Sequence, residues 1–367
     1  MRVNILTPGC TTPNGAAFLF PILRYRRALA ARGTDVRLVG EAARARDCDV
    51  TIVDSKFHRA RWERETPAVV SEFESLKRRT SRLLYFDTTD STAGVQVEIL
   101  PVVDGYFKNQ LLRDRRLYLK PIYGARIYAD YYHRALGVAD AAPEYSTPVP
   151  DPALLSKLQL SWNSGLADYS PLGPARMAVY RRMPLPVLLR FPAAAASPSR
   201  PRPNPVSCRF GAAYSRQSVA WQRLAIRKML GPRVATDKLP RFAYFRELAA
   251  SRIAVSPFGF GEITLKDFEV FLTGGLLLKP DMSHLETWPD FFRANETMIA
   301  HRWDLSDLEA RIDEALADEP RRRAIAGEGQ SRYLRELGTP DAEARFAERF
   351  AALISRQAAP PQSRAAS

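Results

Sequence analysis

Residues Ser256–Gly275 read SPFGFGEITLKDFEVFLTGG, and the apolar run LLLKP follows them directly. Gly259 and Gly261 can adopt positive φ angles, and they let a ligand approach the backbone closely. Gly274 and Gly275 follow a helical pattern, at the point where a left-handed residue commonly ends a helix. The stretch therefore predicts a glycine-containing turn, a short helix and a buried strand in succession.

The start of this helix has its own signal. Thr264 and Asp267 have the spacing of a capping box, in which each side chain accepts a hydrogen bond from the backbone of the other residue. The run IAVSP before the turn predicts a strand, so the helix begins at the carboxyl end of that strand. Ligands of open α/β sheets bind at such ends, where the helix dipole favours an anion such as phosphate.

Two charged residues on the predicted helix leave two interpretations open. Glu269 lies at the border of an apolar arc, where a carboxylate can accept hydrogen bonds from a pair of ligand hydroxyls. Lys266 lies one turn earlier and can contact a phosphate. The alternative is a surface ion pair between the two side chains at i, i+3 spacing, which contributes roughly a few tenths of a kcal/mol.

Residues 1–140 alternate short apolar runs with helical patterns, which is typical of parallel β–α–β units. A helical pattern over residues 16–33 ends at Gly33. The predicted strands cover residues 2–6, 35–39, 49–54, 83–87 and 105–109. These observations predict a doubly wound α/β fold.

A second block with the same alternation follows a proline-rich stretch, FPAAAASPSRPRPNP, whose low complexity predicts a linker or an exposed loop. In this block, strands are predicted at residues 208–215, 253–257, 276–280 and 297–301, and helices at 218–230, 242–251 and 304–320. We expect a first domain over residues 1–150, a linker and loop over 151–205, a second domain over 206–340, a C-terminal helix over 341–357 and a disordered tail over 358–367.

The net charge of the chain is strongly positive. The sequence has 54 Lys and Arg residues against 40 Asp and Glu residues, a formal net charge of +14. The charge is dispersed along the chain, which favours a solvated surface over a nucleic-acid site. An anionic membrane face or a phosphorylated substrate would also suit it.

Other patterns exclude several classes of protein. No apolar run approaches the roughly 20 residues that span a bilayer, and residues 1–10 lack the pattern of a signal peptide. We therefore expect a cytoplasmic protein. Three separated cysteines and four histidines argue against a disulfide framework or a zinc site. The loop after the first strand lacks the G-x-G-x-x-G pattern of a dehydrogenase.

Residues 258–280, FGFGEITLKDFEVFLTGGLLLKP, resemble the donor domain of GT-B glycosyltransferases, with a glycine-rich turn, a helix that carries a glutamate, and a strand that ends near proline. The resemblance implies two Rossmann-like domains that face each other across a cleft, with a C-terminal helix that crosses back to the first domain. It implies that Glu269 holds the ribose hydroxyls of a nucleotide-sugar. The turn with Gly259 and Gly261 would face the diphosphate and the sugar.

The predicted donor site also includes Thr264, Lys266 and Glu262. Many retaining members of the family carry two glutamates with seven residues between them, whereas six residues separate Glu262 from Glu269. The position eight residues before Glu269 is Gly261. The resemblance therefore does not assign retaining or inverting chemistry.

Arginine or lysine residues after the first strand of the donor domain often contact the diphosphate in this family, and the forked guanidinium group suits a phosphate. Arg216 lies just past the predicted strand and is our candidate, with Arg223 on the following helix as the alternative. A solvated surface position is the other interpretation for either side chain. The resemblance implies no metal site and no cofactor, because the nucleotide-sugar is a co-substrate.

The first domain supplies further candidates. Asn14 and Gly15 end the loop TPGCTTPNG, which resembles the loop that borders the cleft in this fold. Asp87 and Asp90 follow the predicted fourth strand, and one of them is the candidate catalytic group that orients an acceptor hydroxyl or takes its proton. The alternative is structural, because both carboxylates can cap turns and helix starts.

These inferences predict a glycosyltransferase that moves a sugar from a nucleotide-sugar to a hydroxyl of a glycan, lipid-linked or small-molecule acceptor, in glycan, polysaccharide or glycolipid synthesis. We expect no nucleic-acid partner, and the predicted partners include an anionic membrane that the protein contacts peripherally. The alternative is a catalytically silent GT-B-like module that binds a nucleotide-sugar or a glycan, which the irregular spacing of the glutamates supports.

Overall fold

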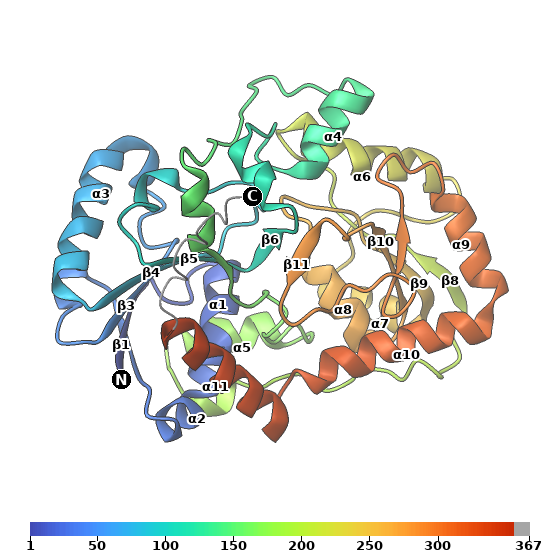
Figure 1. Ribbon diagram of the computed structural model, residues 1–367. Helices are drawn as coiled ribbons and strands as arrows, with labels where there is room; N and C mark the ends of the chain where they lie inside the picture. The colour runs from blue at the N-terminus through green and yellow to red at the C-terminus, as the bar shows by residue number, and fades with distance from the viewer. Residues whose placement is uncertain (356–367) are drawn as a thin grey trace, which may run out of the picture.

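The computed structural model describes residues 1–355. Its first sheet has six parallel strands in the order β2-β1-β3-β4-β5-β7 (Figure 1). The strands are β1 (Arg2–Leu6), β2 (Asp35–Val39), β3 (Val50–Asp54), β4 (Arg82–Asp87), β5 (Gly105–Lys108) and β7 (Leu158–Leu160). In register, Val3 of β1 lies opposite Val36 and Val50. The predicted parallel sheet of the first half is confirmed.

Buried side chains explain why these segments form strands. Every residue of β3 and of β5 is buried, as expected for a parallel sheet that is covered on both faces. The helical pattern predicted over residues 16–33 is interrupted at Tyr25, whose backbone leaves the helical conformation, so two helices form there. The helices of this half are α1 (Pro13–Arg24), α2 (Arg26–Ala31), α3 (Trp62–Arg79) and α4 (Ile127–Leu136).

The second sheet has four parallel strands in the order β12-β10-β9-β8. The strands are β8 (Asn204–Ser207), β9 (Ser251–Val255), β10 (Leu276–Pro280) and β12 (Ile299–His301). The strand predicted over residues 208–215 is wrong, because β8 ends at Ser207. Cys208 and Phe210 in the following loop are buried in the second core, which explains the apolar pattern.

Helices surround this second sheet (Figure 1). They are α6 (Gln217–Leu230), α7 (Arg241–Ala250), α8 (Leu265–Thr273), α9 (Leu308–Ala317) and α10 (Glu319–Arg335). Within residues 1–355, no helix combines the length and the apolar composition that a membrane crossing requires.

A strand pair and a returning helix are among the features that join the two halves. Strand β6 (Gln110–Leu112) of the first half pairs in antiparallel fashion with β11 (Leu285–Thr287) of the second half. Helix α11 (Pro340–Ser355) follows α10 and returns to the first half, where Figure 1 shows it beside α1 and α2. The ring of Phe346 on α11 contacts the rings of Tyr25 and Trp162. The predicted return of the C-terminal helix is confirmed.

Residues 151–205 do more than connect the halves. Strand β7 lies within them and forms the edge of the first sheet. Trp162 is buried and stacks on Phe18, with ring centroids 5.2 Å apart. Helix α5 (Gly173–Tyr180) follows. The interpretation as a linker is therefore corrected where β7 and α5 form, whereas residues 191–203 of the proline-rich stretch form no helix or strand, and the domain boundaries stay predictions. The tail predicted over residues 358–367 lies outside the described residues.

Candidate functional site

Helix α8 begins and ends as the sequence predicts. Thr264 is the N-cap, and Thr264 and Asp267 form both hydrogen bonds of the capping box. Asp267 also accepts a hydrogen bond from Ser256 after β9 (2.6 Å) and pairs with the buried Lys279 of β10 (3.0 Å). Gly274 ends the helix with a φ of 68°. These contacts fix the N-terminus of α8 at the carboxyl ends of β9 and β10.

The two glycines of the turn before α8 line a pocket between the halves, but their backbone differs from the expectation. Neither Gly259 nor Gly261 has a positive φ, so the expectation of left-handed backbone is wrong at both positions. A Cβ atom on Gly261 would lie 2.7 Å from the backbone oxygen of Asp90, and one on Gly259 would lie 3.3 Å from Nη2 of Arg223. The missing side chains therefore let the turn approach the first half and a buried arginine closely.

A pocket of about 340 Å³ lies between the halves at this turn, and we name it the cleft pocket. Its polar lining includes Asn14, Asp90 and Gln110 from the first half and Tyr214, Arg223 and Thr264 from the second half. Helix α1 begins with Pro13 and Asn14, and Thr264 caps α8, so the N-termini of both helices reach the pocket. Two helix N-termini and an arginine favour an anionic ligand.

Arg223, and not Arg216, is the arginine of the cleft pocket. Its guanidinium is buried and donates hydrogen bonds to the carbonyl oxygens of Phe258 (2.6 Å) and Gly211 (2.8 Å). Burial lowers the pKa of this side chain. Arg216 lies outside the pocket lining and pairs with Glu144 of the first half. The geometry therefore corrects the choice of Arg216 and favours the alternative, Arg223.

Glu269 faces a second pocket of about 250 Å³, which we name the glutamate pocket. Its carboxylate pairs with Arg241 of α7, with 3.1 Å between Oε1 and Nη1. Burial raises the pKa of Glu269 to about 7, although Arg241 opposes this shift. The loop Cys10–Thr12 and helix α5 line the other side of the pocket. Pro13 and Leu265 line both pockets, so the two pockets adjoin.

Lys266 lies outside the linings of both pockets. Its Nζ donates hydrogen bonds to the carbonyl oxygens of Arg209 (3.0 Å) and of Val255 at the end of β9 (2.7 Å). Burial lowers the pKa of this ammonium group to about 8. The surface ion pair with Glu269 is therefore also wrong, because each charge has another partner. Lys266 anchors α8 to the strand, which corrects its predicted place in the donor site.

Glu262 is fully buried between the halves. It accepts hydrogen bonds from the Thr92 hydroxyl (2.6 Å) and from Gln110 Nε2 (3.3 Å), and both partners belong to the first half. Nε2 of His284 lies 3.7 Å from its other oxygen. Glu262 thus joins the halves and does not line either pocket, which corrects its predicted role as a donor ligand.

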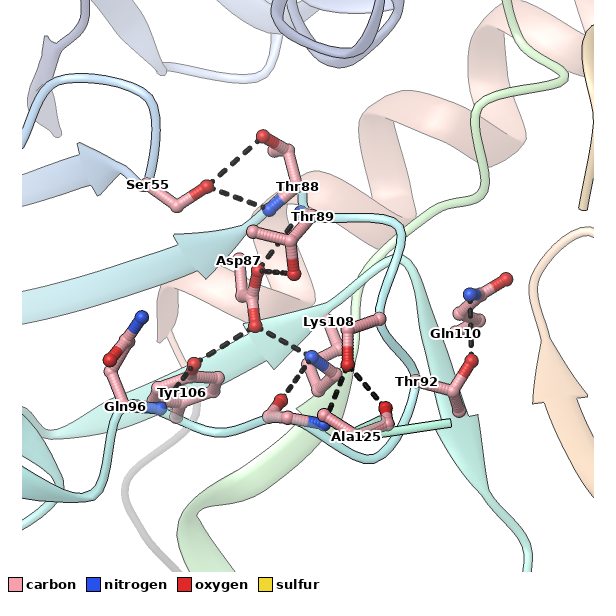
Figure 2. A network of polar contacts seen from close by, with 12 residues as sticks. Ser55, Asp87, Thr88, Thr89, Thr92, Gln96, Tyr106, Lys108, Gln110 and Ala125 are labelled. Atoms are coloured by element: carbon pink, nitrogen blue, oxygen red, sulfur yellow. Dashed lines mark hydrogen bonds and ion pairs between the residues drawn. The ribbon is translucent and has the colours of Figure 1, made fainter. Parts of the chain in front are cut away.

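Asp87 is buried and held by protein groups (Figure 2). Its carboxylate accepts hydrogen bonds from Tyr106 (2.9 Å), Lys108 (2.6 Å) and the Thr89 hydroxyl (2.6 Å). Burial, the largest single cause, would raise the pKa of Asp87, but the Lys108 ammonium and the hydrogen bonds from Lys108 and Thr89 together hold the pKa below its ordinary value. The structural alternative fits Asp87, and the geometry gives no support to a catalytic role.

Asp90 is exposed at the cleft pocket. Its carboxylate accepts a hydrogen bond from Asn14 Nδ2 (2.8 Å), which also lies 3.1 Å from the carbonyl oxygen of Thr88. Gly15 follows inside α1, where its N–H donates to the Thr12 hydroxyl that caps the helix (3.1 Å). Of the two predicted aspartates, Asp90 is therefore the one that can face a ligand.

Sequence reasoning missed Arg241 and helix α5. The pattern FAYFREL predicts a helix but contains nothing that directs the preceding arginine to a carboxylate on another helix. Helix α5 lies in the stretch interpreted as a linker, although Pro174 near its start is a helix-start signal. Within residues 1–355, no three His, Cys, Asp or Glu side chains are grouped so that they could hold a metal ion.

A known protein family matches the second half of the chain. Residues 206–348 match the family described as "Glycosyl transferase-like". This range begins within β8 and includes strands β9 to β12, the glycine turn and helix α8 with Glu269. None of the curated proteins matches the sequence of the chain.

Several solved structures are similar to the chain over most of its length. Anabaena HepE in complex with UDP-glucose is 9% identical, with a TM-score of 0.47, and the match covers 96% of this chain and 100% of HepE. A sucrose-phosphate synthase from Thermosynechococcus elongatus is 10% identical, with a TM-score of 0.46 and coverage of 96% and 99%. A glycosyltransferase from Rickettsia africae is 7% identical, with a TM-score of 0.47 and coverage of 96% and 98%.

The architecture and the family match agree. The structure has two parallel α/β halves, a pocket between them at the carboxyl ends of strands, and a last helix that returns to the first half. The chain therefore has the GT-B fold, and its residues 206–348 match the family described as "Glycosyl transferase-like".

Proposed function

We propose that this protein transfers a sugar from a nucleotide-sugar donor to an acceptor hydroxyl in the cleft. The observation that carries the proposal is the position of Glu269, a nearly buried carboxylate that faces a pocket between the two halves. A carboxylate with a pKa of about 7 is largely ionised above neutral pH and can then accept hydrogen bonds from both ribose hydroxyls of a nucleotide. The family match over the same residues supports this role.

The adjoining cleft pocket suits the diphosphate. Arg223 and the N-termini of α1 and α8 supply positive charge and N–H donors there. Such preorganised groups stabilise the charge that builds on a departing diphosphate. Because Leu265 lines both pockets, a donor can extend from the glutamate pocket into the cleft pocket.

Asp90 is the proposed group that orients the acceptor hydroxyl or takes its proton. It lies across the cleft pocket from α8, on the first half. Transfer without a metal or cofactor, and a glycan, lipid-linked or small-molecule acceptor, belong to the proposal. It includes no nucleic-acid partner.

The first test is a calorimetric panel of UDP, GDP, ADP, CMP and their common sugar conjugates. We expect micromolar binding of one nucleotide to the wild type, with at least a tenfold loss in Glu269→Ala. Glu247→Ala is the matched control, because Glu247 is also paired with an arginine (Arg209, 2.8 Å) but lies outside both pockets. The control should bind like the wild type.

Two outcomes would change this proposal. If no nucleotide binds, or if both variants bind equally well, the donor site is not where we place it. If a nucleotide-sugar binds but no turnover or donor hydrolysis follows with any acceptor, the protein is instead a silent binding module. Product formation with Asp90→Asn then tests the acceptor side separately.

A further inference from the structure

The segment of residues 172–191 exposes an unusual set of apolar side chains. The five large ones are between 43% and 57% exposed: Leu172, Val179, Met183, Leu185 and Val187. Every residue from Arg181 to Val187, RRMPLPV, is exposed. Exposed apolar side chains normally occur singly, and a contiguous group marks a contact surface.

Both ends of this segment are fixed to the body of the protein. At the first end, Arg176 of α5 pairs with the nearly buried Asp168. At the other end, the ring of Phe191 contacts the rings of Phe20 and Tyr25. The fold therefore holds the apolar side chains outward between two anchored ends.

Arginines surround these apolar side chains. Six of them are exposed, and none forms an ion pair with a residue in the range 1–355: Arg24, Arg26, Arg27, Arg181, Arg182 and Arg190. Two surface hollows bring the groups together, one of about 720 Å³ between Leu38 and residues 178–184, and one of about 840 Å³ between α1, α2 and residues 186–191. Neither hollow has an acidic residue in its lining. We name these six arginines, with Leu38, Val179, Met183, Leu185 and Val187, the arginine–apolar face.

We propose that the arginine–apolar face docks on the surface of an anionic phospholipid membrane. Apolar side chains that enter the headgroup boundary and cations that meet lipid phosphates are the two components of interfacial binding. The chemistry matches this occupant better than a second copy of the chain, because a twofold contact would bring six unpaired arginines against six others. The net charge of +14 has the same sign as the face.

The position of the face gives docking a consequence. Cys10, Thr11, Ala178 and Arg181 line both the hollow beside residues 178–184 and the glutamate pocket. A membrane on this face would therefore lie beside the glutamate pocket, within reach of an acceptor that carries a lipid. This consequence rests on the proposed function, whereas docking itself does not.

Vesicle flotation tests the proposal. We expect the full chain to float with vesicles of equal parts phosphatidylglycerol and phosphatidylcholine, and to bind vesicles of phosphatidylcholine alone at least tenfold more weakly. The triple variant Met183→Ser, Leu185→Ser, Val187→Ser should bind the anionic vesicles at least tenfold more weakly than the wild type. The double variant Arg27→Glu, Arg182→Glu should lose at least as much affinity for the anionic vesicles. Each arginine near an anionic surface strengthens binding roughly fivefold, or by ~1 kcal/mol.

Matched variants on other surfaces serve as controls. Leu136→Ser, Leu224→Ser, Phe242→Ser removes three exposed apolar side chains, and Arg78→Glu, Arg246→Glu reverses two exposed charges. Both controls should float like the wild type, as should Glu269→Ala, so that failure of the donor site and failure of the membrane site can be told apart.

Three results would overturn the proposal. The first is that the wild type does not float with the anionic vesicles. The second is that the control variants lose as much binding as the variants of the face. The third is a dimer in sedimentation that the triple serine variant dissociates, because the face would then belong to a second copy.

Discussion

Oε1 of Glu269 and Nη1 of Arg241 lie 3.1 Å apart across the packed helices α8 and α7. Arg241 also donates hydrogen bonds to the carbonyl oxygens of Ser170 and Pro171 (both 2.8 Å). One guanidinium therefore connects the proposed ribose ligand to the backbone just before α5. A change in the charge of Glu269 would therefore alter the contacts of Arg241 with the backbone just before α5, a helix that lines the glutamate pocket.

Glu269→Gln should change how stability depends on pH. The folded-state pKa of Glu269 is raised from 4.5 to about 7, so the folded protein holds this proton more tightly than the unfolded chain does. Relative to the variant, the wild type therefore loses stability as the pH rises from 4.5 to 7, by up to about 3 kcal/mol. Urea unfolding of both proteins across this range measures the difference, and a constant difference would contradict the raised pKa.

Arg223→Met and Arg216→Ala should differ in their effects. The first leaves the carbonyls of Phe258 and Gly211 without their buried donor, and we expect a loss of about 2–4 kcal/mol in stability. The second removes a partly exposed ion pair with Glu144, which costs less than about 1 kcal/mol. Urea unfolding gives both values, and calorimetry should show weaker diphosphate binding only for Arg223→Met. Equal affinities would remove Arg223 from the proposed site.

Gly261→Ala should destabilise the contact between the halves. The new Cβ would lie 2.7 Å from the backbone oxygen of Asp90, so the turn must shift, at a cost of about 1–3 kcal/mol. Gly327→Ala is the control, because this residue is inside α10 and no atom of another segment lies within 4 Å of the place that its Cβ would take. The control variant should be more stable than the wild type by about 0.5–1 kcal/mol in the free energy of unfolding. If Gly261→Ala unfolds at a higher temperature than Gly327→Ala, the close approach of Gly261 to Asp90 does not contribute to stability.

Asp87→Asn and Asp90→Asn separate a structural carboxylate from a candidate catalytic one. Asp87→Asn leaves the buried Lys108 ammonium without its partner and should cost about 3–5 kcal/mol. Asp90→Asn should change stability by less than about 1 kcal/mol, because the side chain is exposed, yet lower turnover about 100-fold or more. Unfolding and product formation measure the two effects. Full turnover by Asp90→Asn would remove it from catalysis.

Local signals predict the parts of the fold that local physics determines. The capping box of Thr264 and Asp267 and the left-handed Gly274 place α8 correctly, because each depends on atoms within one helical turn. Buried strands such as β3 are recognisable because both faces are covered. The three-residue strands β6, β7 and β11 are not recognisable, since pairing with distant segments decides their conformation.

The candidate site also combines features that the local sequence predicts with features that depend on distant segments. Local pattern directs Glu269 toward the cleft, but its partner Arg241 comes from a different helix, and no spacing rule connects the two. Asp87 and Asp90 look alike in the sequence, and only the neighbouring strand, with Lys108, distinguishes the buried carboxylate from the exposed one. Charge at a strand end was therefore predictable, whereas its availability to a ligand depends on tertiary contacts.

The β6–β11 pair has a consequence for motion. Gln110–Leu112 and Leu285–Thr287 form a short ladder between the halves, and an ion pair between Arg115 and Glu286 (2.7 Å) reinforces it. Separation of the halves at this point would break several bonds at once, whereas rotation about the ladder axis would preserve them. We therefore expect that any relative rotation of the two halves turns about this ladder and breaks contacts elsewhere between them, such as the hydrogen bond between Ser218 and Asp140 (2.7 Å).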